Sequence, residues 1–374
     1  MTSVCILTNV HGPFDTRIFH KQARSLEANG YDVTLLAPVD EHDYRDGIDI
    51  VPVGTHASRI DRWANLGTVY QRARHMNADV YHLHDPELLP LGVALANRTE
   101  SRVVYDVHED FSMTLEHRDW VPDLIAPILT KSISGIQPRV ADQVDAVVTA
   151  TEWIARPFHD RGVDPCITVR NFPNIERIGP VRPTMDIDQK YLLGYVGGLS
   201  ERRGLHRMLA CLRRLVDDDI DAGLVLVGPF NEPDADQFTT EFIQRHGLDE
   251  RVHLTGYLDY EDIFGVLSAA DVGLILADPA VYEFVISTKM FEYMYCSLPV
   301  VATETPSVNK YLPMDAGVTV DYANPDDQYA AIKELLLDDH RRNEMGAQGR
   351  EAVKETYNWS VEAQRLLELY DNLT

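Results

Sequence analysis

The chain has 374 residues, 45% of them hydrophobic, as in ordinary soluble globular proteins, and it is too long for one ordinary core. Its formal net charge of −25 disfavours nucleic acid as a partner, because most of the surface would repel phosphates. No apolar run approaches the roughly 18 residues of a membrane-spanning helix. The N-terminus, MTSVCILTNVHG, lacks a basic segment and a long apolar run. We therefore expect a first strand there rather than a signal peptide, and a cytoplasmic protein.

The four cysteines are scattered and form no Cys-x-x-Cys pair. This spacing disfavours both a zinc site and a disulfide framework. We expect small, buried side chains at Cys5, Cys166, Cys211 and Cys296.

In the first half of the chain, short apolar runs alternate with helical patterns. The segment RIFHKQARSLEANG predicts a helix that ends at Gly30. Strands are expected at 4–10, 31–38, 79–85, 102–110 and 145–151, and the segment 166–174 closes this half. Proline and charge enrichment over 171–188 predicts a linker.

The second half repeats the alternation and ends in an amphipathic helix at 357–373. Its strands are expected within 190–204, 222–228, 251–259, 270–277, 298–304 and 316–321. Strand–helix alternation predicts parallel sheets covered on both faces, so the fold class is α/β with two Rossmann-like, doubly wound domains facing across a cleft. We expect an N-terminal domain at 1–175, a second domain at 176–355, and a final helix at 356–374.

The turn YVGGLSERRG, residues 195–204, is a candidate anion site. Gly197 and Gly198 would let backbone N–H groups approach an anion, and Arg202 and Arg203 would add positive charge. A tight turn with solvent-exposed arginines is the plainer alternative. The turn does not have the Gly-x-Gly-x-x-Gly pattern of dinucleotide sites, which leaves an NAD-dependent oxidoreductase as a weak alternative.

The segment STKMFEYM places Lys289 at the start of a predicted helix, where the helix dipole disfavours a cation. A phosphate bound there, at Ser287 and Thr288, would remove this conflict. Glu292, one turn later, could then accept hydrogen bonds from ribose hydroxyls. The alternative is a surface pair of Lys289 and Glu292 that contributes about 0.2–0.5 kcal/mol. Glu283, in the preceding loop, could meet hydroxyls of a second sugar.

Four histidines follow predicted strands of the first half: His11, His82, His84 and His108. Any one of them is more often a buried structural residue than a catalyst. Several at the carboxyl ends of strands in one sheet would share the edge at which α/β proteins bind ligands. His108 is flanked by carboxylates, which favour its protonated form.

The whole chain resembles the retaining GT-B glycosyltransferases of the Glu-x7-Glu group, which are similar to glycosyltransferase family 4 and to the glycosyl transferases of group 1. The resemblance rests on HGPFDTRIFHKQARSLEANGYDVTLLAP, YVGGLSERRGL, GLVLVGP, VHLTGYLDYEDIFGVLSAADVGLIL and STKMFEYMYCSLPVVATE. It implies transfer of a sugar from a nucleoside-diphosphate sugar to a hydroxyl of a glycan or polyprenyl-linked glycan, with retention of configuration. No cofactor and no obligatory metal are implied.

The resemblance also implies roles for individual residues. Arg203 and Gly204 match the pair that grips the donor phosphate, and Glu292 matches the glutamate expected on the ribose. His108 matches the histidine that touches the donor sugar near the reacting carbon, and Gly12, in the loop HGPFDTR, is placed among the donor-binding residues.

Two positions depart from the family pattern. The family often has an arginine directly after the first glycine of the 197–204 loop, where this chain has Gly198, and Lys289 is expected to replace that cation. Glu283 lies nine positions before Glu292 instead of eight, which leaves open whether it is the first glutamate of the motif.

Other functions remain open from the sequence: a sugar-nucleotide epimerase of the same fold, or a non-catalytic protein that binds nucleotide sugars. Basic residues within 117–140 lie beside the apolar segment PDLIAPIL. They suggest either a peripheral contact with the cytoplasmic face of a membrane or a plain amphipathic helix.

The chain contains 7 lysines and 27 arginines beside its 59 acidic residues. An acidic, lysine-poor composition suggests a halophilic protein, since concentrated salt screens such charges within a few Å. We predict that the melting temperature rises as KCl is increased. A melting temperature that is highest at low KCl would contradict this prediction.

Overall fold

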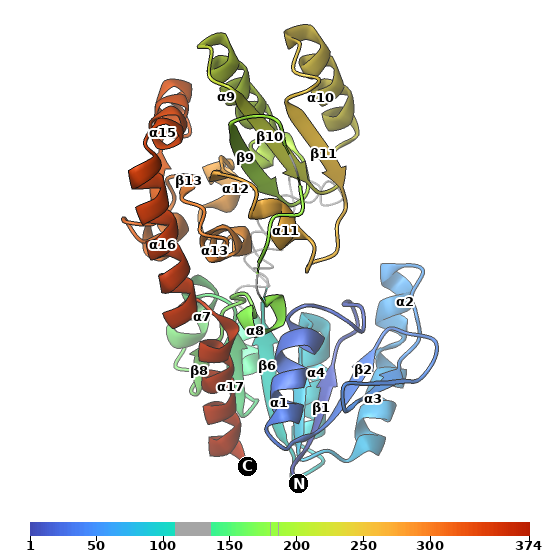
Figure 1. The fold of residues 1–374 in the computed structure, drawn as a ribbon. Helices are drawn as coiled ribbons and strands as arrows, with labels where there is room; N and C mark the ends of the chain where they lie inside the picture. Colours follow the sequence, from blue (N-terminus) through green and yellow to red (C-terminus); the bar gives the residue numbers. More distant parts are fainter. Residues whose placement is uncertain (109–135, 180, 186) are drawn as a thin grey trace. The chain divides into compact units, whose positions relative to one another are not determined.

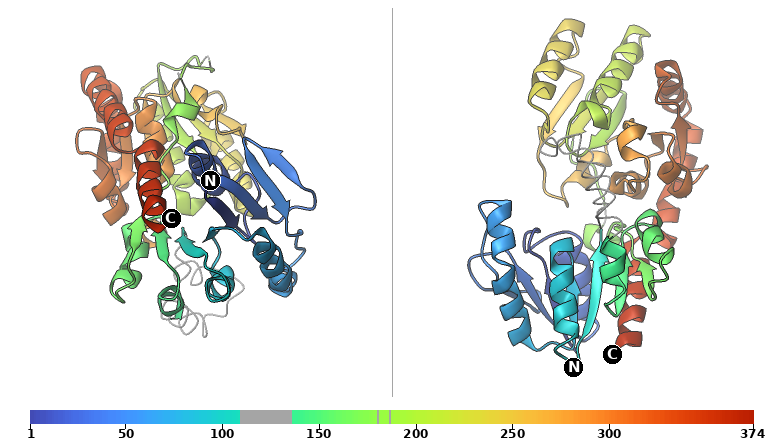
Figure 2. Two further views of the ribbon diagram at one scale, coloured as in Figure 1. Left: turned by 90° about the horizontal axis from the view of Figure 1, so that it is seen from below. Right: turned by 180° about the vertical axis from the view of Figure 1, so that it is seen from behind.

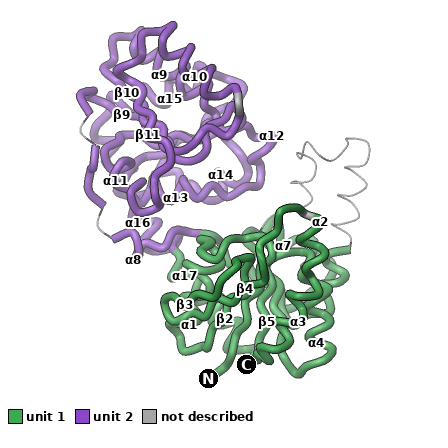
Figure 3. Tube along the Cα trace, turned by 90° about the vertical axis from the view of Figure 1, so that its right-hand side faces the viewer, with its two compact units in different colours: residues 1–171, 359–374 green, residues 172–358 purple. Residues whose placement is uncertain are grey.

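The computed structural model describes residues 1–108, 136–179, 181–185 and 187–374. The chain forms two compact units, coloured separately in Figure 3. Unit 1 consists of residues 1–171 and 359–374, and unit 2 of residues 172–358. The boundaries expected from the sequence were residues 175 and 355.

Unit 1 contains an eight-stranded sheet in the order β3-β4-β2-β1-β5-β6-β7-β8 (Figure 1). All neighbouring strands are parallel except β3 and β4, which are antiparallel. The strands are β1 (Ser3–Leu7), β2 (Asp32–Ala37), β3 (Asp43–Arg45), β4 (Ile48–Pro52), β5 (Val80–Leu83), β6 (Arg102–Val107), β7 (Ala146–Thr149) and β8 (Cys166–Thr168). The helices are η1 (Ile18–Ala23), α1 (Arg24–Ala28), α2 (Arg59–Ala64), α3 (Leu66–Met76), η2 (Pro86–Leu88), α4 (Leu89–Ala96), α7 (Glu152–His159) and α17 (Trp359–Leu373).

Helices cover both faces of this sheet. Successive residues of a strand point to opposite faces, so each strand contributes side chains to both layers. In β1, Val4 and Ile6 pack in one apolar cluster with side chains of η1, α1 and α17. Cys5 and Leu7 pack in a second cluster with side chains of α3, α4 and α7. The residues of β1 are therefore apolar on both faces, as expected for a central strand of a buried parallel sheet.

The last helix, α17, belongs to unit 1, although unit 2 separates it from the rest of that unit in the sequence. The Trp359 Nε1 donates to Ser25 Oγ at 2.9 Å, and the Tyr370 hydroxyl lies 2.8 Å from His82 Nδ1. Arg170 forms an ion pair with Glu362 at 3.0 Å. The two termini consequently lie close together at one end of unit 1 (Figures 1 and 2).

Unit 2 contains a six-stranded sheet in the order β11-β10-β9-β12-β13-β14, and all its neighbouring strands are parallel. The strands are β9 (Tyr191–Val196), β10 (Ala222–Val227), β11 (Val252–Gly256), β12 (Val272–Ile275), β13 (Val300–Thr303) and β14 (Gly317–Val320). The helices are α8 (Ile175–Ile178), η3 (Glu201–Arg203), α9 (Leu205–Asp217), α10 (Pro233–His246), α11 (Ile263–Leu267), α12 (Pro279–Tyr282), α13 (Thr288–Tyr295), α14 (Pro306–Tyr311), α15 (Pro325–Leu337) and α16 (Asp339–Glu355).

Helices α9 and α15 pack on one face of this sheet, where Leu193 and Tyr195 of β9 join their apolar cluster. Helix α13 is joined to the strands through Tyr293. Its ring lies where a Cβ on Gly273 of β12 would stand, and its hydroxyl accepts a hydrogen bond from the Val196 N–H at 3.0 Å. The end of β9 and helix α13 are therefore held together.

Each unit is a doubly wound α/β domain, so the predicted fold class is confirmed. Among the residues that the structure describes, no helix is long and apolar enough to cross a membrane. Most of the segment suggested as a membrane contact, 117–140, lies outside the described residues.

Candidate functional site

In unit 2, the loop after β9 brings the backbone close to its neighbours. Gly197 has φ of +124°, which a residue with a side chain rarely adopts, and its N–H donates to Val227 O at 2.8 Å. The chain then forms the short helix η3 and begins α9 at Gly204, where a Cβ would stand 2.4 Å from Leu276 O. These two glycines are therefore required by the conformation and close packing of the loop.

Helix α13 begins without a side-chain cap. Ser287 occupies the N-cap position in an extended conformation, but its side chain accepts no hydrogen bond from the first turn. Thr288 and Lys289 are the first two residues of the helix. Uncapped N–H groups and the helix dipole favour a bound anion at this end.

Lys289 and Arg203 meet at Gly197. A Cβ placed on Gly197 would lie 3.1 Å from Lys289 Nζ and 3.5 Å from Arg203 Nη1. The Lys289 Nζ donates to the Tyr195 hydroxyl at 3.0 Å, which in turn donates to Gly198 O at 3.0 Å. The Arg203 Nε donates to the Tyr282 hydroxyl at 3.0 Å. Within the described part of the chain, neither cation forms an ion pair with a carboxylate.

The electrostatics of Lys289 reflect this arrangement. Burial, and then the neighbouring Arg203 guanidinium, lower the pKa of Lys289 to about 7. An anion bound between the two cations would favour the protonated lysine and reverse this effect. A multiply charged anion would therefore relieve the repulsion between the two cations.

Glu292 lies one turn further along α13 and is only 6% exposed. Burial, and then the adjacent Glu292 carboxylate to which its hydroxyl is hydrogen-bonded, raise the pKa of Tyr260 well above its ordinary value. An ionised carboxylate is an acceptor only, so Glu292 suits a ligand that presents hydroxyl groups.

Two other predicted residues take no part in this cluster. The Glu283 side chain is exposed directly after α12, and the Arg202 side chain is exposed on η3. Sequence reasoning missed Tyr195, Tyr260 and Tyr282. Tyr282 stands beside Glu283 in the sequence, but no local pattern shows that its hydroxyl, rather than the neighbouring carboxylate, reaches Arg203.

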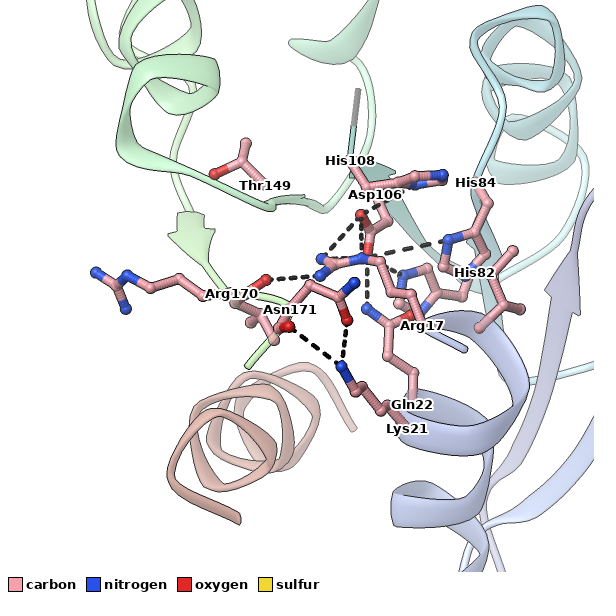
Figure 4. Close-up of polar contacts among 12 residues, drawn as sticks. Arg17, Lys21, Gln22, His82, His84, Asp106, His108, Thr149, Arg170 and Asn171 are labelled. Atoms are coloured by element: carbon pink, nitrogen blue, oxygen red, sulfur yellow. Dashed lines mark hydrogen bonds and ion pairs between the residues drawn. The ribbon is translucent and has the colours of Figure 1, made fainter. Parts of the chain in front are cut away.

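In unit 1, polar side chains converge on Asp106, which is the second-last residue of β6 and is fully buried (Figure 4). Both of its oxygens accept hydrogen bonds from Arg17, with the Arg17 Nη2 at 2.9 Å, and one also accepts from Gln22. Burial opposes ionisation, but Arg17 and the nearby histidines hold the pKa of Asp106 well below its ordinary value. The network is therefore an ionised pair neutralised inside the unit.

The histidines predicted at strand ends gather around this pair. His82 and His108 each have a ring nitrogen 3.7 Å from an Asp106 oxygen, and His84 has one at 4.0 Å. Burial lowers the pKa of His84 well below its ordinary value. The rings of His82 and His84 stack with centroids 4.7 Å apart.

The ligand atoms of His82, His84 and Asp106 lie within 4.8 Å of one another. The ligands of a tetrahedral ion with bonds of about 2.1 Å stand only about 3.4 Å apart. Arg17 also occupies both oxygens of the carboxylate. As they stand, these described residues fit an ion-pair network better than a metal centre.

His108 reaches the loop after β1. Its Nε2 lies 3.0 Å from the Nε2 of His11, so one nitrogen must donate and the other must accept. The same His11 nitrogen is 3.5 Å from an oxygen of the buried Asp85. Gly12, the next residue, lines a cavity of about 500 Å³ at this edge of the sheet. The other residues that line it are Asn9, Val10, Pro38, Thr55, His56, Ala57, Ser58 and Arg62.

Two doubly wound α/β units, each with polar side chains at the carboxyl ends of its strands, define a GT-B fold. Solved structures share it over nearly their whole length. Sucrose-phosphate synthase from Thermosynechococcus elongatus has a TM-score of 0.76 at 17% identity, covering 100% of this chain and 99% of its own. HepE of Anabaena in complex with UDP-glucose has a TM-score of 0.75 at 14% identity, covering 100% of both chains. WaaG, a glycosyltransferase involved in lipopolysaccharide biosynthesis, has a TM-score of 0.68 at 15% identity over 98% of both chains.

The chain belongs to the glycosyltransferases. Residues 182–352 match the family described as glycosyl transferases group 1, and residues 16–171 match the glycosyl transferase 4-like domain. A similar protein is the phosphatidyl-myo-inositol mannosyltransferase of Mycobacterium tuberculosis, 23% identical over 94% of this chain and 91% of its own. Another is the alpha-maltose-1-phosphate synthase of Mycolicibacterium smegmatis, 23% identical over 76% and 82%. The glycosyltransferase family and GT-B fold expected from the sequence are thereby confirmed.

Removing the guanidinium of Arg17 should destabilise unit 1. In Arg17→Met, Asp106 would remain buried without its counter-charge, so we expect the free energy of unfolding to fall by about 3–5 kcal/mol. Arg102→Met is the matched control, since Arg102 pairs with Asp145 at a side-chain exposure of 55% and should cost less than about 1 kcal/mol. Urea denaturation measures both variants, and equal losses would contradict the role given to the buried pair.

Proposed function

We propose that the protein transfers a sugar from a nucleoside-diphosphate sugar to a hydroxyl group of an acceptor, with retention of configuration and without an obligatory metal. The observation that carries this proposal is the convergence of Lys289 and Arg203 at Gly197, beside the uncapped start of α13. Two cations without a carboxylate partner suit a diphosphate.

In this reaction the leaving group is a diphosphate, so the catalyst must chiefly stabilise developing negative charge. Lys289, Arg203 and the N–H groups at Ser287 and Thr288 would supply that stabilisation. A dry, preformed site makes such interactions stronger than they are in water. That HepE, which is similar in fold, was solved with UDP-glucose agrees with a nucleotide-sugar donor.

The remaining donor contacts follow the family resemblance. Glu292 would accept hydrogen bonds from the ribose hydroxyls, with its carboxylate held by Tyr260. Glu283 would meet hydroxyls of the transferred sugar in the role of the first glutamate of the family's motif, although it lies nine positions before Glu292 instead of eight. Arg202 would lie at the outer side of the phosphates. In unit 1, His108 and Gly12 would contact the transferred sugar.

The acceptor site is proposed in the cavity of unit 1 that Gly12 lines. Its walls carry polar groups from Asn9, Thr55, His56 and Ser58, with Arg62 beside them. Such groups suit the hydroxyl-rich head of a glycan or a lipid-linked glycan better than an aliphatic chain. The mycobacterial relative is named as a mannosyltransferase of a phosphatidylinositol. We therefore propose action at the cytoplasmic face of a membrane, in a protein adapted to concentrated salt.

Retention is proposed to occur on one face of the sugar. The bond between the anomeric carbon and the diphosphate oxygen breaks, and the acceptor oxygen forms its bond to the same face of that carbon. The acceptor proton passes to the departing diphosphate, so the protein needs no nucleophile of its own.

The experiment that tests this function begins with a thermal-shift screen of UDP-, GDP- and ADP-sugars in concentrated KCl. The donor that raises the melting temperature is then incubated with candidate acceptors, and the anomeric configuration of the product is determined by NMR. A product with inverted configuration would contradict retention. Formation of an epimerised nucleotide sugar in the absence of acceptor would overturn the transferase assignment.

The donor cluster can be tested by truncation. Lys289→Ala and Glu292→Ala should each weaken nucleoside-diphosphate binding about tenfold, which corresponds to about 1.4 kcal/mol, because each loses a direct ligand contact. Lys354→Ala, on α16, is the control, since Lys354 is 47% exposed in its pair with Glu351. Isothermal titration calorimetry measures the three affinities. Unchanged affinity in both site variants would refute the site assignment.

Diphosphate binding should also depend on pH. With the pKa of Lys289 at about 7, the free protein carries a protonated lysine below pH 7 and a neutral one above it. Binding above pH 7 must therefore take up a proton, so affinity should fall up to about tenfold per pH unit between pH 7 and 9. Lys289→Arg stays protonated throughout this range, and its affinity should be nearly constant. Parallel slopes in the two proteins would contradict the prediction.

A further inference from the structure

The two glycines of the β9 loop have different neighbours. Gly197 faces Lys289 and Arg203. A Cβ on Gly198 would lie 2.0 Å from Nδ2, 2.6 Å from Cγ and 2.8 Å from Oδ1 of Asn231. The carboxamide of Asn231 therefore occupies the space into which any side chain at position 198 would have to grow.

The backbone holds Asn231 in this place. It lies four residues beyond the end of β10, in the loop next to that of β9, and its N–H donates to Leu199 O at 3.0 Å. Phe230 forms a bridge with Leu199, so the two loops continue the parallel pairing of their strands beyond β9 and β10. Asn231 is thus placed at the carboxyl edge of the sheet, beside the glycine pair.

The hydrogen-bonding groups of the Asn231 side chain are not used within the described part of the protein. It is exposed, and its carboxamide makes no hydrogen bond with any residue in the described part of the chain. A carboxamide offers two N–H donors and one acceptor oxygen. These groups remain available to a ligand, beside Gly198, which directly follows the glycine at which Lys289 and Arg203 meet.

We propose that Asn231 is a donor-binding residue: its Nδ2 donates a hydrogen bond to the diphosphate, in the place of the cation that Gly198 lacks. This inference rests on the proposed function, because the diphosphate is the donor's. Many members of the resembling family have an arginine at position 198, and here the glycine leaves that space to a neutral amide from the neighbouring loop. Lys289 and Arg203 supply the positive charge, and the hydrogen bond from Asn231 fixes the orientation of the diphosphate.

The test asks whether the effects of substitutions at positions 198 and 231 on diphosphate affinity depend on each other. Gly198 does not have a positive φ, so Gly198→Ala imposes no backbone strain and chiefly displaces the Asn231 amide. Asn231→Ala and Gly198→Ala should each weaken binding of UDP, GDP or ADP about three- to tenfold, the loss expected for one hydrogen bond. The double variant should bind no more weakly than Asn231→Ala alone.

Asn231→Asp provides a readout that a merely structural role would not change. The substitution keeps the shape of the side chain but replaces the donor by a negative charge, so diphosphate affinity should fall more than tenfold while uridine or guanosine binding stays unchanged. Asn309→Ala is the control, since Asn309 bonds to Glu304 on the exposed surface of α14. Calorimetry in concentrated KCl measures the affinities, and the melting temperature of each variant is recorded beside them.

The outcomes separate the two proposals. If wild-type protein binds none of the three diphosphates, or if Lys289→Ala and Glu292→Ala both bind as wild type does, the proposed function fails. If Lys289→Ala weakens binding but Asn231→Ala and Asn231→Asp do not, the role of Asn231 is refuted and the proposed function stands. Additive losses in the Gly198→Ala/Asn231→Ala double variant would also refute it.

Discussion

Two cations held side by side without a carboxylate between them set the character of unit 2. Lys289 and Arg203 both approach Gly197, and each is held by a tyrosine hydroxyl rather than by an acid. Burial of like charges costs free energy, which shows in the lowered pKa of the lysine. A tyrosine can fix the direction of a cation without neutralising it, so the positive potential remains available to a ligand. The glycine between them and the uncapped helix start extend the same arrangement into the backbone.

Unit 1 handles its buried charge in the opposite way. Asp106 accepts hydrogen bonds from Nε and Nη2 of Arg17, so its charge is neutralised within the unit without a ligand. The role of this pair is therefore to fix the end of β6, which precedes His108, and not to bind a ligand.

The elements that carry these sites also anchor the segments where the chain passes from one unit to the other. Lys21, on η1, donates to Asn171 and lies 5.8 Å from the Trp359 ring centroid. Phe291, between Lys289 and Glu292 on α13, packs 4.6 Å from Phe172 and 5.3 Å from Tyr357. The elements that carry the candidate site residues therefore pack directly against both crossing segments.

The sequence predicted most strands of the two sheets and the loops at their edges, because apolar runs and helix signals are local properties of the chain. It did not predict β3 and β4, which form the antiparallel pair at one edge of the sheet of unit 1. The position of Lys289 at a helix start was predicted from the same kind of signal. Its partner at Gly197 comes from another element, and only the family resemblance had connected the two loops. Tyr282 and Asn231 could not be predicted at all. Their roles arise from where one side chain lies relative to a distant glycine or arginine, and no spacing along the chain encodes that distance. The buried ion pair of Arg17 and Asp106 was missed for the same reason. In addition, the carboxylates beside His108 were interpreted by their effect on the histidine, and not as partners of an arginine.

The use of lysine at position 289, in a chain with 7 lysines and 27 arginines, has a physical reason. An arginine keeps its charge at any accessible pH, so a second arginine beside Arg203 would impose its repulsion and desolvation on the empty protein permanently. A lysine with a pKa of about 7 can release its proton when no anion is present and recover it when a diphosphate enters. The cost of holding two partly buried cations together then falls only on the state in which an anion stabilises both. For the same reason, a neutral amide suits the third position of the cluster better than another cation. In the proposed role, Asn231 would give the site a hydrogen-bond donor for the diphosphate without a third charge that the empty protein would have to carry.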